Sequence, residues 1–286
     1  MEKRDKKEIR NAVRETYGKI ARTGSAKPEG DTTDSSRILY EIAYSESRQP
    51  SCCGQSACYA NTMSEVMGYK KEDIEGVPEG ANMGLGCGNP VALAYIKAGE
   101  TVVDLGSGGG FDCFLAAKQV GDSGVVIGVD MTPEMISRAR MKNKKAAVRN
   151  VEFRLGEIEH LPVEDNTADL IISNCVINLS PQKRQVYQDA FRVLKPGGRL
   201  AVSDILAQKP LPEDIQKDLS LVSACIGGAA TIEDTQKMLK AAGFENISIT
   251  PKKISQELID EVLPGSLDGE YVVSAYIQAQ KPVSNT

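Results

Sequence analysis

The sequence has 286 residues, of which 41% are hydrophobic and 26% are charged, and its formal net charge at pH 7 is −5. A chain of this length is expected to bury one sizeable core and to carry an appendage. Its acidic balance argues against a nucleic-acid substrate, because nucleic-acid-binding surfaces are rich in lysine and arginine. No stretch approaches the roughly eighteen apolar residues of a membrane-spanning helix, and the N-terminus lacks a signal peptide. We therefore expect a cytoplasmic protein with a small-molecule substrate and no nucleic-acid or membrane partner.

Seven cysteines and a single histidine, His160, limit the chemistry that the chain can carry out. In a cytoplasmic protein, cysteines are more often buried, metal-binding or redox-active than part of a disulfide framework. One histidine offers little to a zinc site of mixed ligands or to histidine-based acid–base catalysis. The positions of the cysteines are therefore more informative than their number.

Residues 1–80 read as an N-terminal extension. Residues 5–20 place Ile9, Val13, Tyr17 and Ile20 at helical spacing, which predicts an amphipathic helix that packs on the rest of the chain as a lid or brace. Further along, Cys52, Cys53 and Cys58 lie within seven residues of sequence.

Adjacent cysteines cannot easily bridge one another, but each can meet a more distant thiol. This cluster is therefore predicted to be redox-active or to cap a metal, and loop cysteines without a role are the alternative. Which two of the three thiols form a redox pair is left open.

The loop at residues 78–90 surrounds Cys87 with four glycines. A free cysteine usually lies in the core as a small hydrophobic residue. Cys87 in a glycine-rich loop is therefore a candidate for chemistry, whereas Cys113, on the apolar face of a predicted helix, is expected to be core packing.

Residues 101–117 predict a strand, a tight glycine loop and a helix. A second buried strand, residues 124–130, ends in Asp130 about twenty residues after the loop, which suits the binding of ribose hydroxyls. Thr132 as a cap and Pro133 at the first helical position predict that the next helix begins there. The match to a nicotinamide-binding loop is incomplete, because Phe111 stands where the third glycine of that fingerprint belongs.

The strand at residues 169–174 ends directly before Cys175. Ligands of open parallel sheets bind outside the carboxyl ends of the strands, so Cys175 is expected to face the reaction space. An insert at residues 205–230, after the strand at residues 199–204, carries Cys225 beside glycines. A helix from about Thr231 and two late strands, residues 246–250 and 271–279, complete a seven-stranded, mostly parallel sheet with helices on both faces.

Five segments, DLGSGGG, VIGVD, GEIEHLP, DLIISN and LKPGGRL, resemble motifs of class I S-adenosylmethionine-dependent methyltransferases. The resemblance implies an α/β, Rossmann-like methyltransferase domain at residues 81–282 that follows the Cys-bearing extension. A Rossmann-like domain for another nucleotide is the alternative. The resemblance also implies that these residues hold S-adenosylmethionine: Asp104, Gly106, Ser107, Gly108, Asp130, Met131, Gly156, Glu157, Ile158 and Asn174.

The segments GLGCGNP, SNCVINLS and SACIGGA, together with the Cys-Cys pair, resemble arsenite S-adenosylmethionine methyltransferases. The resemblance implies that Cys87, Cys175 and Cys225 bind trivalent arsenic, supplied as arsenite or its thiol conjugate. Trivalent arsenic is a soft, thiophilic centre, which suits thiolate ligands. Methylation formally oxidises arsenic, so Cys52 and Cys53, with thioredoxin or a glutathione-like thiol as reductant, are predicted to return it to the trivalent state.

Two rival functions remain at this point. A methyltransferase of a small organic acceptor, such as a quinone precursor, shares the fold but needs a base and leaves three cysteines unexplained. A binding module could hold structural zinc through Cys52, Cys53, Cys58 and Cys87, but their spacing lacks the usual two-residue knuckle.

Overall fold

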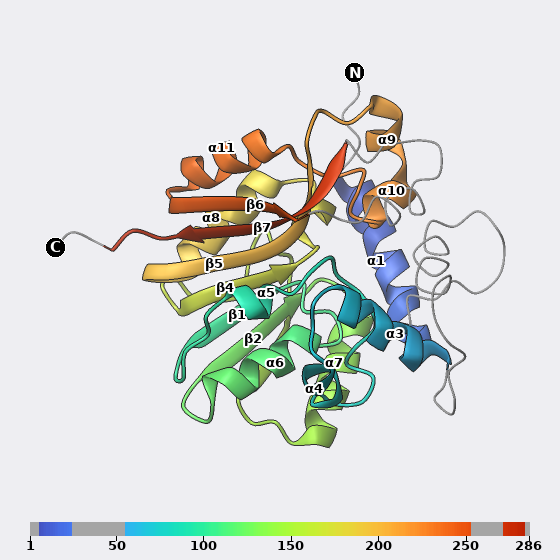
Figure 1. Cartoon of the computed structure of the whole chain (residues 1–286), viewed down its shortest axis with the longest axis vertical. Helices are drawn as coiled ribbons and strands as arrows, with labels where there is room; N and C mark the ends of the chain where they lie inside the picture. Colours follow the sequence, from blue (N-terminus) through green and yellow to red (C-terminus); the bar gives the residue numbers. More distant parts are fainter. Residues whose placement is uncertain (1–5, 25–54, 253–270, 284–286) are drawn as a thin grey trace.

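A computed structural model of the chain describes residues 6–24, 55–252 and 271–283 (Figure 1). These residues contain a seven-stranded sheet with the strand order β3-β2-β1-β4-β5-β7-β6, in which β7 is antiparallel to both of its neighbours. The predicted seven-stranded, mostly parallel sheet is therefore confirmed. Its strands are β1 (Thr101–Leu105), β2 (Val125–Asp130), β3 (Val151–Leu155), β4 (Ala168–Asn174), β5 (Leu194–Ala207), β6 (Glu245–Lys252) and β7 (Val272–Gln280).

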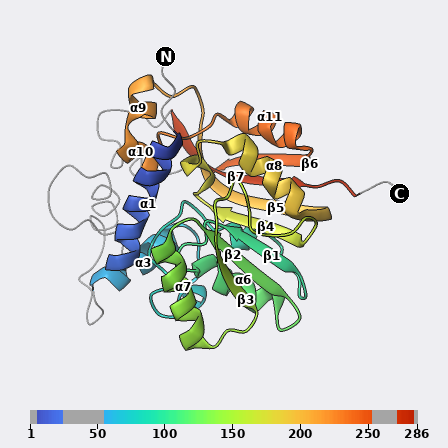
Figure 2. The same ribbon diagram turned by 180° about the vertical axis from the view of Figure 1, so that it is seen from behind.

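Helices cover both faces of the sheet (Figures 1 and 2). Successive residues of β1 point to opposite faces, so Val102 packs with α6 and α7 while Val103 packs with α8. Burial on both faces explains why the central strands read as apolar runs. The helical segments are α1 (Lys6–Thr23), α3 (Gln55–Val66), α4 (Lys71–Glu75), α5 (Pro90–Leu93), α6 (Phe111–Val120), α7 (Pro133–Ala146), η1 (Ile177–Leu179), α8 (Lys183–Val193), α9 (Glu213–Lys217), α10 (Leu219–Ser223) and α11 (Ile232–Ala242).

The strand predicted at residues 199–204 begins earlier, at Leu194, so the whole LKPGGRL segment lies within β5. Leu194 pairs with Ala168 and Arg199 pairs with Leu170, so the residues between them bulge out of the ladder. Gly197, at φ +79°, takes the left-handed conformation that this bulge requires. The glycines are thus a kink within one strand rather than a loop that precedes it.

The predicted N-terminal helix is confirmed as α1, which lies across the carboxyl ends of the strands and contacts α7, α10 and η1 (Figures 1 and 2). Further along the extension, Met63, Met67, Tyr69 and Ile74 pack into the same core as α6. Residues 63–74 of the extension therefore share the core of the sheet, and the domain division at residue 80 stays a prediction. In the described part of the chain, no helix has the length and apolar character needed to cross a bilayer.

Candidate active site

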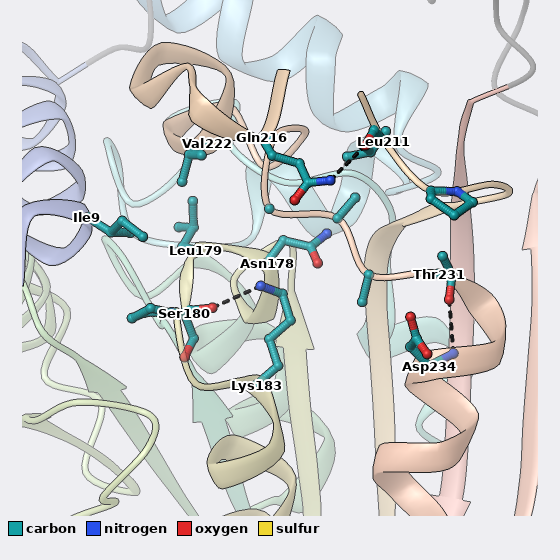
Figure 3. A pocket seen from close by; sticks show the side chains of 16 residues that line it. Ile9, Asn178, Leu179, Ser180, Lys183, Leu211, Gln216, Val222, Thr231 and Asp234 are labelled. Atoms are coloured by element: carbon teal, nitrogen blue, oxygen red, sulfur yellow. Dashed lines mark hydrogen bonds between the residues drawn. The ribbon is translucent and has the colours of Figure 1, made fainter. Parts of the chain in front are cut away.

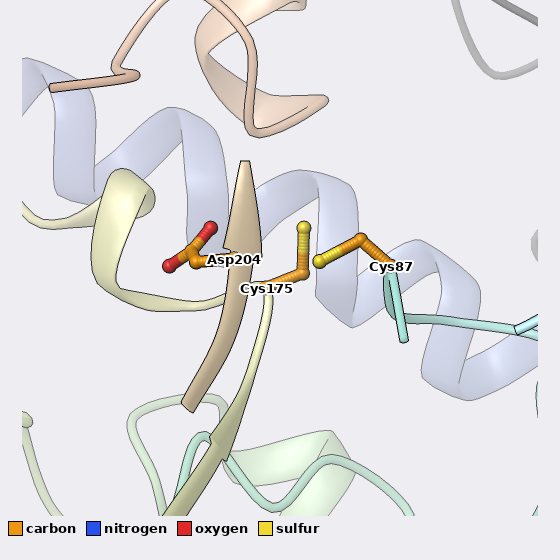
Figure 4. A group of neighbouring side chains, drawn as sticks. All are labelled: Cys87, Cys175 and Asp204. Carbon is orange, nitrogen blue, oxygen red and sulfur yellow. The ribbon is translucent and has the colours of Figure 1, made fainter. Parts of the chain in front are cut away.

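Three cysteines from separate loops meet at the carboxyl edge of the sheet. The main-chain amide of Cys175, directly after β4, donates to the carbonyl oxygen of Ser203 in β5 at 2.8 Å. The thiol of Cys225, just after α10, donates to the carbonyl oxygen of Cys175 at 2.8 Å. The sulfur atoms of Cys87 and Cys175 lie side by side, within 4.8 Å of each other and of a carboxylate oxygen of Asp204 (Figure 4). The structure thus brings together the three thiols that the sequence singled out.

Two of these cysteines have left-handed backbone conformations, with φ at +58° for Cys175 and +66° for Cys225. Such angles are uncommon outside glycine and cluster at functional sites. The main-chain bonds to Ser203 and Val222 hold the two residues there. The fold thus maintains backbone strain at both positions. Glycine would relieve this strain, but it would not supply a thiol.

We expect this strain to be measurable at Cys225. Alanine at this position keeps the strain of the left-handed backbone, which lowers the free energy of unfolding by about 1–2 kcal/mol. Glycine relieves that strain, but it gives the unfolded chain more conformational freedom, which lowers the free energy of unfolding by about 0.5–1 kcal/mol. Cys225→Gly should therefore be at least as stable as Cys225→Ala. At Cys113, inside α6, glycine should instead be about 1 kcal/mol less stable than alanine. Urea unfolding measures both differences, and the same penalty for glycine at both sites would contradict the prediction.

The surroundings of Cys87 and Cys175 keep both thiols protonated. Burial raises the pKa of the Cys87 thiol, and contacts with the Cys225 and Cys87 thiols raise the pKa of Cys175 well above its ordinary value. Cys87 and Cys175 are therefore neutral thiols rather than thiolates at neutral pH.

Cys113 is fully buried against Asp104, as core packing predicts.

Asn174, the last residue of β4, ties the Cys87 loop to this strand. Its Oδ1 accepts the main-chain amide of Cys87 at 2.9 Å, and its Nδ2 donates to the carbonyl oxygen of Gly88 at 2.8 Å and to the hydroxyl of Tyr69 at 3.0 Å. Tyr69 in turn donates to Asp112 at 2.6 Å. The predicted contact of Asn174 with the cofactor stays a prediction, and its side chain has the added role of placing Cys87 beside Cys175.

Asp204 of β5 lies beside the thiols, and the sequence alone does not single it out as a residue of the site. Its side chain is buried and accepts hydrogen bonds from the amides of Ile177 (3.0 Å) and Ile205 (2.8 Å) and from the Asn178 side chain (2.9 Å). Asn178 also donates to the carbonyl oxygen of Cys225 at 3.3 Å. Asp204 therefore connects β5 to η1 and to the Cys225 loop, and the only sequence signal was an acid at a strand's carboxyl end.

We expect Asp204 to make stability depend on pH. Burial raises its pKa to about 7, whereas an aspartate in an unfolded chain titrates near about 3.9. Between these values the native state holds a proton that the unfolded state has lost, so the Asp204 contribution to stability falls as pH rises from about 4 to about 7. The full loss is up to about 4 kcal/mol.

Asp204→Asn should remove the part of the pH dependence of stability that comes from Asp204. Burial also raises the pKa of Asp112, to about 6, and the Asp112 contribution to the pH dependence is the same in both proteins. Urea unfolding of the two proteins at several pH values measures the difference in slope. Parallel pH profiles would show that Asp204 does not titrate in this range.

The predicted glycine loop lies between β1 and α6. The amides of Gly106 and Ser107 donate to the carbonyl oxygen of Val129 at 2.7 and 3.0 Å, which fixes the loop over β2. A Cβ at Gly106 would collide with the side chain of Val176, so that position is closed to any side chain. At Gly108 the nearest atom would be in Met83, 3.8 Å away, so this part of the loop leaves room for a ligand.

Asp130 stands at the end of β2, as predicted. Its two carboxylate oxygens accept the amides of Gly108 at 3.0 Å and Thr132 at 2.8 Å. Pro133 begins α7 as expected, but the Thr132 hydroxyl interacts with Asp130 instead of capping the helix. Burial raises the pKa of Asp130, while these amide donors oppose the rise.

The loop suits a ligand that carries an amino-acid group and a ribose. Within the described residues, the Ser107 hydroxyl is buried without a hydrogen-bond partner. The open face at Gly108 leaves room above the backbone, and Asp130 places a carboxylate acceptor beside it. These features fit S-adenosylmethionine.

The other predicted cofactor residues surround this loop from different sides. Gly156 donates its amide to the carbonyl oxygen of Asp130 at 3.0 Å, and Met131 shares a hydrophobic cluster with Cys175. Glu157 forms an ion pair with Arg14 of α1 at 2.7 Å. The Ile158 side chain is buried, and Asp104 accepts the Cys113 thiol beneath the loop. Cys52 and Cys53 lie outside the described residues, as does the side chain of Cys58.

A cavity of about 340 Å³ lies beside η1, between α8, the insert and the start of α11 (Figure 3). Lys183 extends along it and donates to the carbonyl oxygen of Ser180 at 2.9 Å. Burial lowers the pKa of Lys183 to about 8. The described lining includes none of the three cysteines, so this cavity is separate from the thiols.

The sequence also matches known proteins. A family model described as a methyltransferase domain matches residues 96–243. An arsenite methyltransferase of Halobacterium salinarum is 48% identical over 279 residues, which are 98% of this chain and 68% of that protein. The chain belongs to the arsenite methyltransferase family.

Two further members of this family show how much of the chain the likeness covers. A human arsenite methyltransferase is 37% identical over 59% of this chain and 49% of its own length. The crystal structure of CrArsM, an arsenic(III) S-adenosylmethionine methyltransferase from Chlamydomonas reinhardtii, has a TM-score of 0.59 at 32% identity and covers 82% of this chain and 76% of its own. The chain therefore spans between about half and three quarters of these relatives.

Proposed function

We propose that the protein transfers the methyl group of S-adenosylmethionine to trivalent arsenic held by Cys87, Cys175 and Cys225. The observation that carries this proposal is the convergence of three thiols beside a glycine loop that suits S-adenosylmethionine. Family membership favours this function over methylation of a quinone precursor, which would leave the three thiols without a role.

The neutral thiols suit the binding of arsenite. Arsenous acid, As(OH)₃, carries three hydroxyl groups, and each thiol can replace one of them. Three As–O bonds break, three As–S bonds form, and the three thiol protons leave in three molecules of water. The raised pKa of Cys87 and Cys175 means that these two ligands start as neutral thiols, and the hydroxyl groups that leave arsenic carry the thiol protons away, so the overall exchange needs no external base.

When bound, S-adenosylmethionine supplies an electrophilic methyl group on a sulfonium. We assign its amino-acid end to the backbone of Gly106, Ser107 and Gly108, its ribose to Asp130, and its adenine to the neighbourhood of Met131 and residues 156–158. The thiols gather on one side of arsenic and leave its lone pair as the nucleophile. The chain therefore needs to position its substrates and has no proton to remove from the nucleophile.

The test is the identity of the methylated product. Purified protein with arsenite, labelled S-adenosylmethionine and a thiol should yield labelled methylarsenicals, whereas a quinone precursor offered under the same conditions should remain unlabelled. Labelled quinone product without labelled arsenic would overturn the proposal.

We further propose that Cys52 and Cys53 recycle arsenic. Methyl transfer oxidises As(III) to As(V), and two thiols can return two electrons as they form a disulfide, which thioredoxin or a glutathione-like thiol then reduces. The double variant Cys52→Ser, Cys53→Ser should lose about tenfold or more in multiple turnover and keep a nearly normal first methylation. Rapid-quench kinetics separates the two, and equal losses in both would contradict the recycling role.

A further inference from the structure

One side chain outside the predicted site contacts both halves of it. Tyr17 of α1 shares a hydrophobic cluster with Cys225, Cys175 and Met131. On its other side it packs with a second cluster that includes Met83 and Met135, near the glycine loop. Tyr17 therefore lies between the thiols and the residues assigned to the cofactor.

The Tyr17 hydroxyl is directed at the Cys225 loop. It donates to the carbonyl oxygen of Ser223 at 3.4 Å and interacts with the Cys225 thiol. Burial, together with the nearby groups of Cys225, Cys175 and Asp130, raises the pKa of Tyr17 well above its ordinary value. The phenol therefore stays neutral and remains a hydrogen-bond donor.

A buried ion pair holds α1 in place over the site. Arg10 pairs with Glu159 at 3.1 Å, and Glu159 is only 3% exposed and also accepts the Ser180 hydroxyl at 2.7 Å. Because a buried ion pair is costly to break, this contact fixes the position of Tyr17 relative to the sheet edge. Arg22 also pairs with Glu134, in the first turn of α7, at 2.6 Å, but this pair is exposed to solvent and contributes little to the docking of α1.

We propose that Tyr17 is a positioning residue of the active site, whose hydroxyl holds the sulfur of Cys225 and whose ring closes the space between the thiols and the cofactor loop. This inference rests on the proposed function. Once Cys225 has lost its proton to the leaving water, its sulfur can only accept hydrogen bonds, and the Tyr17 hydroxyl is a donor beside it. The ring keeps water from the region in which arsenic and the methyl donor must meet.

The test compares Tyr17→Phe, which removes only the hydroxyl, with Tyr17→Leu, which also removes the ring. Tyr17→Phe should lower the affinity for arsenite about ten- to a hundredfold, as expected for one hydrogen bond to a charged group, and leave the affinity for S-adenosylmethionine unchanged. Tyr17→Leu should weaken both. The As–S absorption band reports arsenite binding directly when it is read as the difference between the spectra with and without arsenite, which removes the absorbance of the nine tyrosines. Calorimetry gives the cofactor affinity.

Two control variants distinguish an effect of Tyr17 on Cys225 from a general loosening of α1 on the sheet edge. Arg22→Ala breaks an exposed ion pair of α1 without touching the thiols, and Tyr95→Phe removes a hydroxyl from an exposed tyrosine. Both should bind arsenite as the unaltered protein does. Normal arsenite affinity in Tyr17→Phe, or equal losses in Arg22→Ala, would overturn the inference. Failure of the proposed function itself would instead remove the As–S band from the unaltered protein.

Discussion

Replacement of Cys175 or Cys225 by serine is expected to abolish arsenic methylation, with a loss of at least about a thousandfold for arsenite. A serine hydroxyl is a hard ligand and binds soft trivalent arsenic far more weakly than a thiolate. Both residues stand where the strand end and the insert meet, and the thiol of one donates to the carbonyl oxygen of the other. Loss of either sulfur therefore leaves arsenic without the pair of ligands that we expect to hold it throughout successive methylations.

Cys87→Ser is expected to behave differently. Each added methyl group displaces one sulfur from arsenic, so a monomethylated substrate needs only two thiolates. Cys87 comes from a loop that precedes the sheet and is held there through Asn174. This variant should lose activity on arsenite but retain it on an already methylated arsenical.

The measurement is product speciation for arsenite and for monomethylarsenite with each variant. Cys113→Ser is the matched control for arsenic binding, because that thiol is fully buried away from the other three. Full activity of all three single variants on arsenite would contradict the site and return the quinone-type function to first place.

The second large effect is expected for Asp130→Ala, which should weaken the binding of S-adenosylmethionine about a hundredfold. The carboxylate lies beside the open face of the loop at Gly108, where ribose hydroxyls can donate to it, and such charged hydrogen bonds contribute about 1.5–3 kcal/mol. The substitution also leaves the amides of Gly108 and Thr132 without their acceptor, which loosens the loop itself.

Titration calorimetry measures this change directly. Asp122→Ala, at an exposed turn before β2, removes the same charge from the surface and should keep normal affinity. Arsenite binding, followed by the As–S band, should be little changed in Asp130→Ala, because the thiols do not depend on that carboxylate. Cofactor affinity in Asp130→Ala equal to that of Asp122→Ala would contradict the assignment.

Much of the cofactor site could be predicted from the sequence because its determinants are local. Apolar runs broken by glycines predict a strand, a loop and a helix, since only glycine readily adopts the left-handed angles of Gly106 and Gly110. The rule that ligands bind at the carboxyl ends of parallel strands then placed Asp130 and Cys175 at one edge. Where local signals conflicted with packing, as in the bulge around Gly197, the predicted boundary was wrong by a few residues.

By itself, the sequence determined the sheet, the glycine loop, the family and the cysteines that deserve a role. Only the tertiary structure decided how those cysteines are held, because their supports come from distant segments. Asp204 reaches the Cys225 loop through Asn178, Asn174 binds the Cys87 amide, and Tyr17 arrives on a helix from the start of the chain. Helical periodicity indicates that α1 has an apolar face, but the surface on which that face packs depends on the shape and charge of the folded sheet edge.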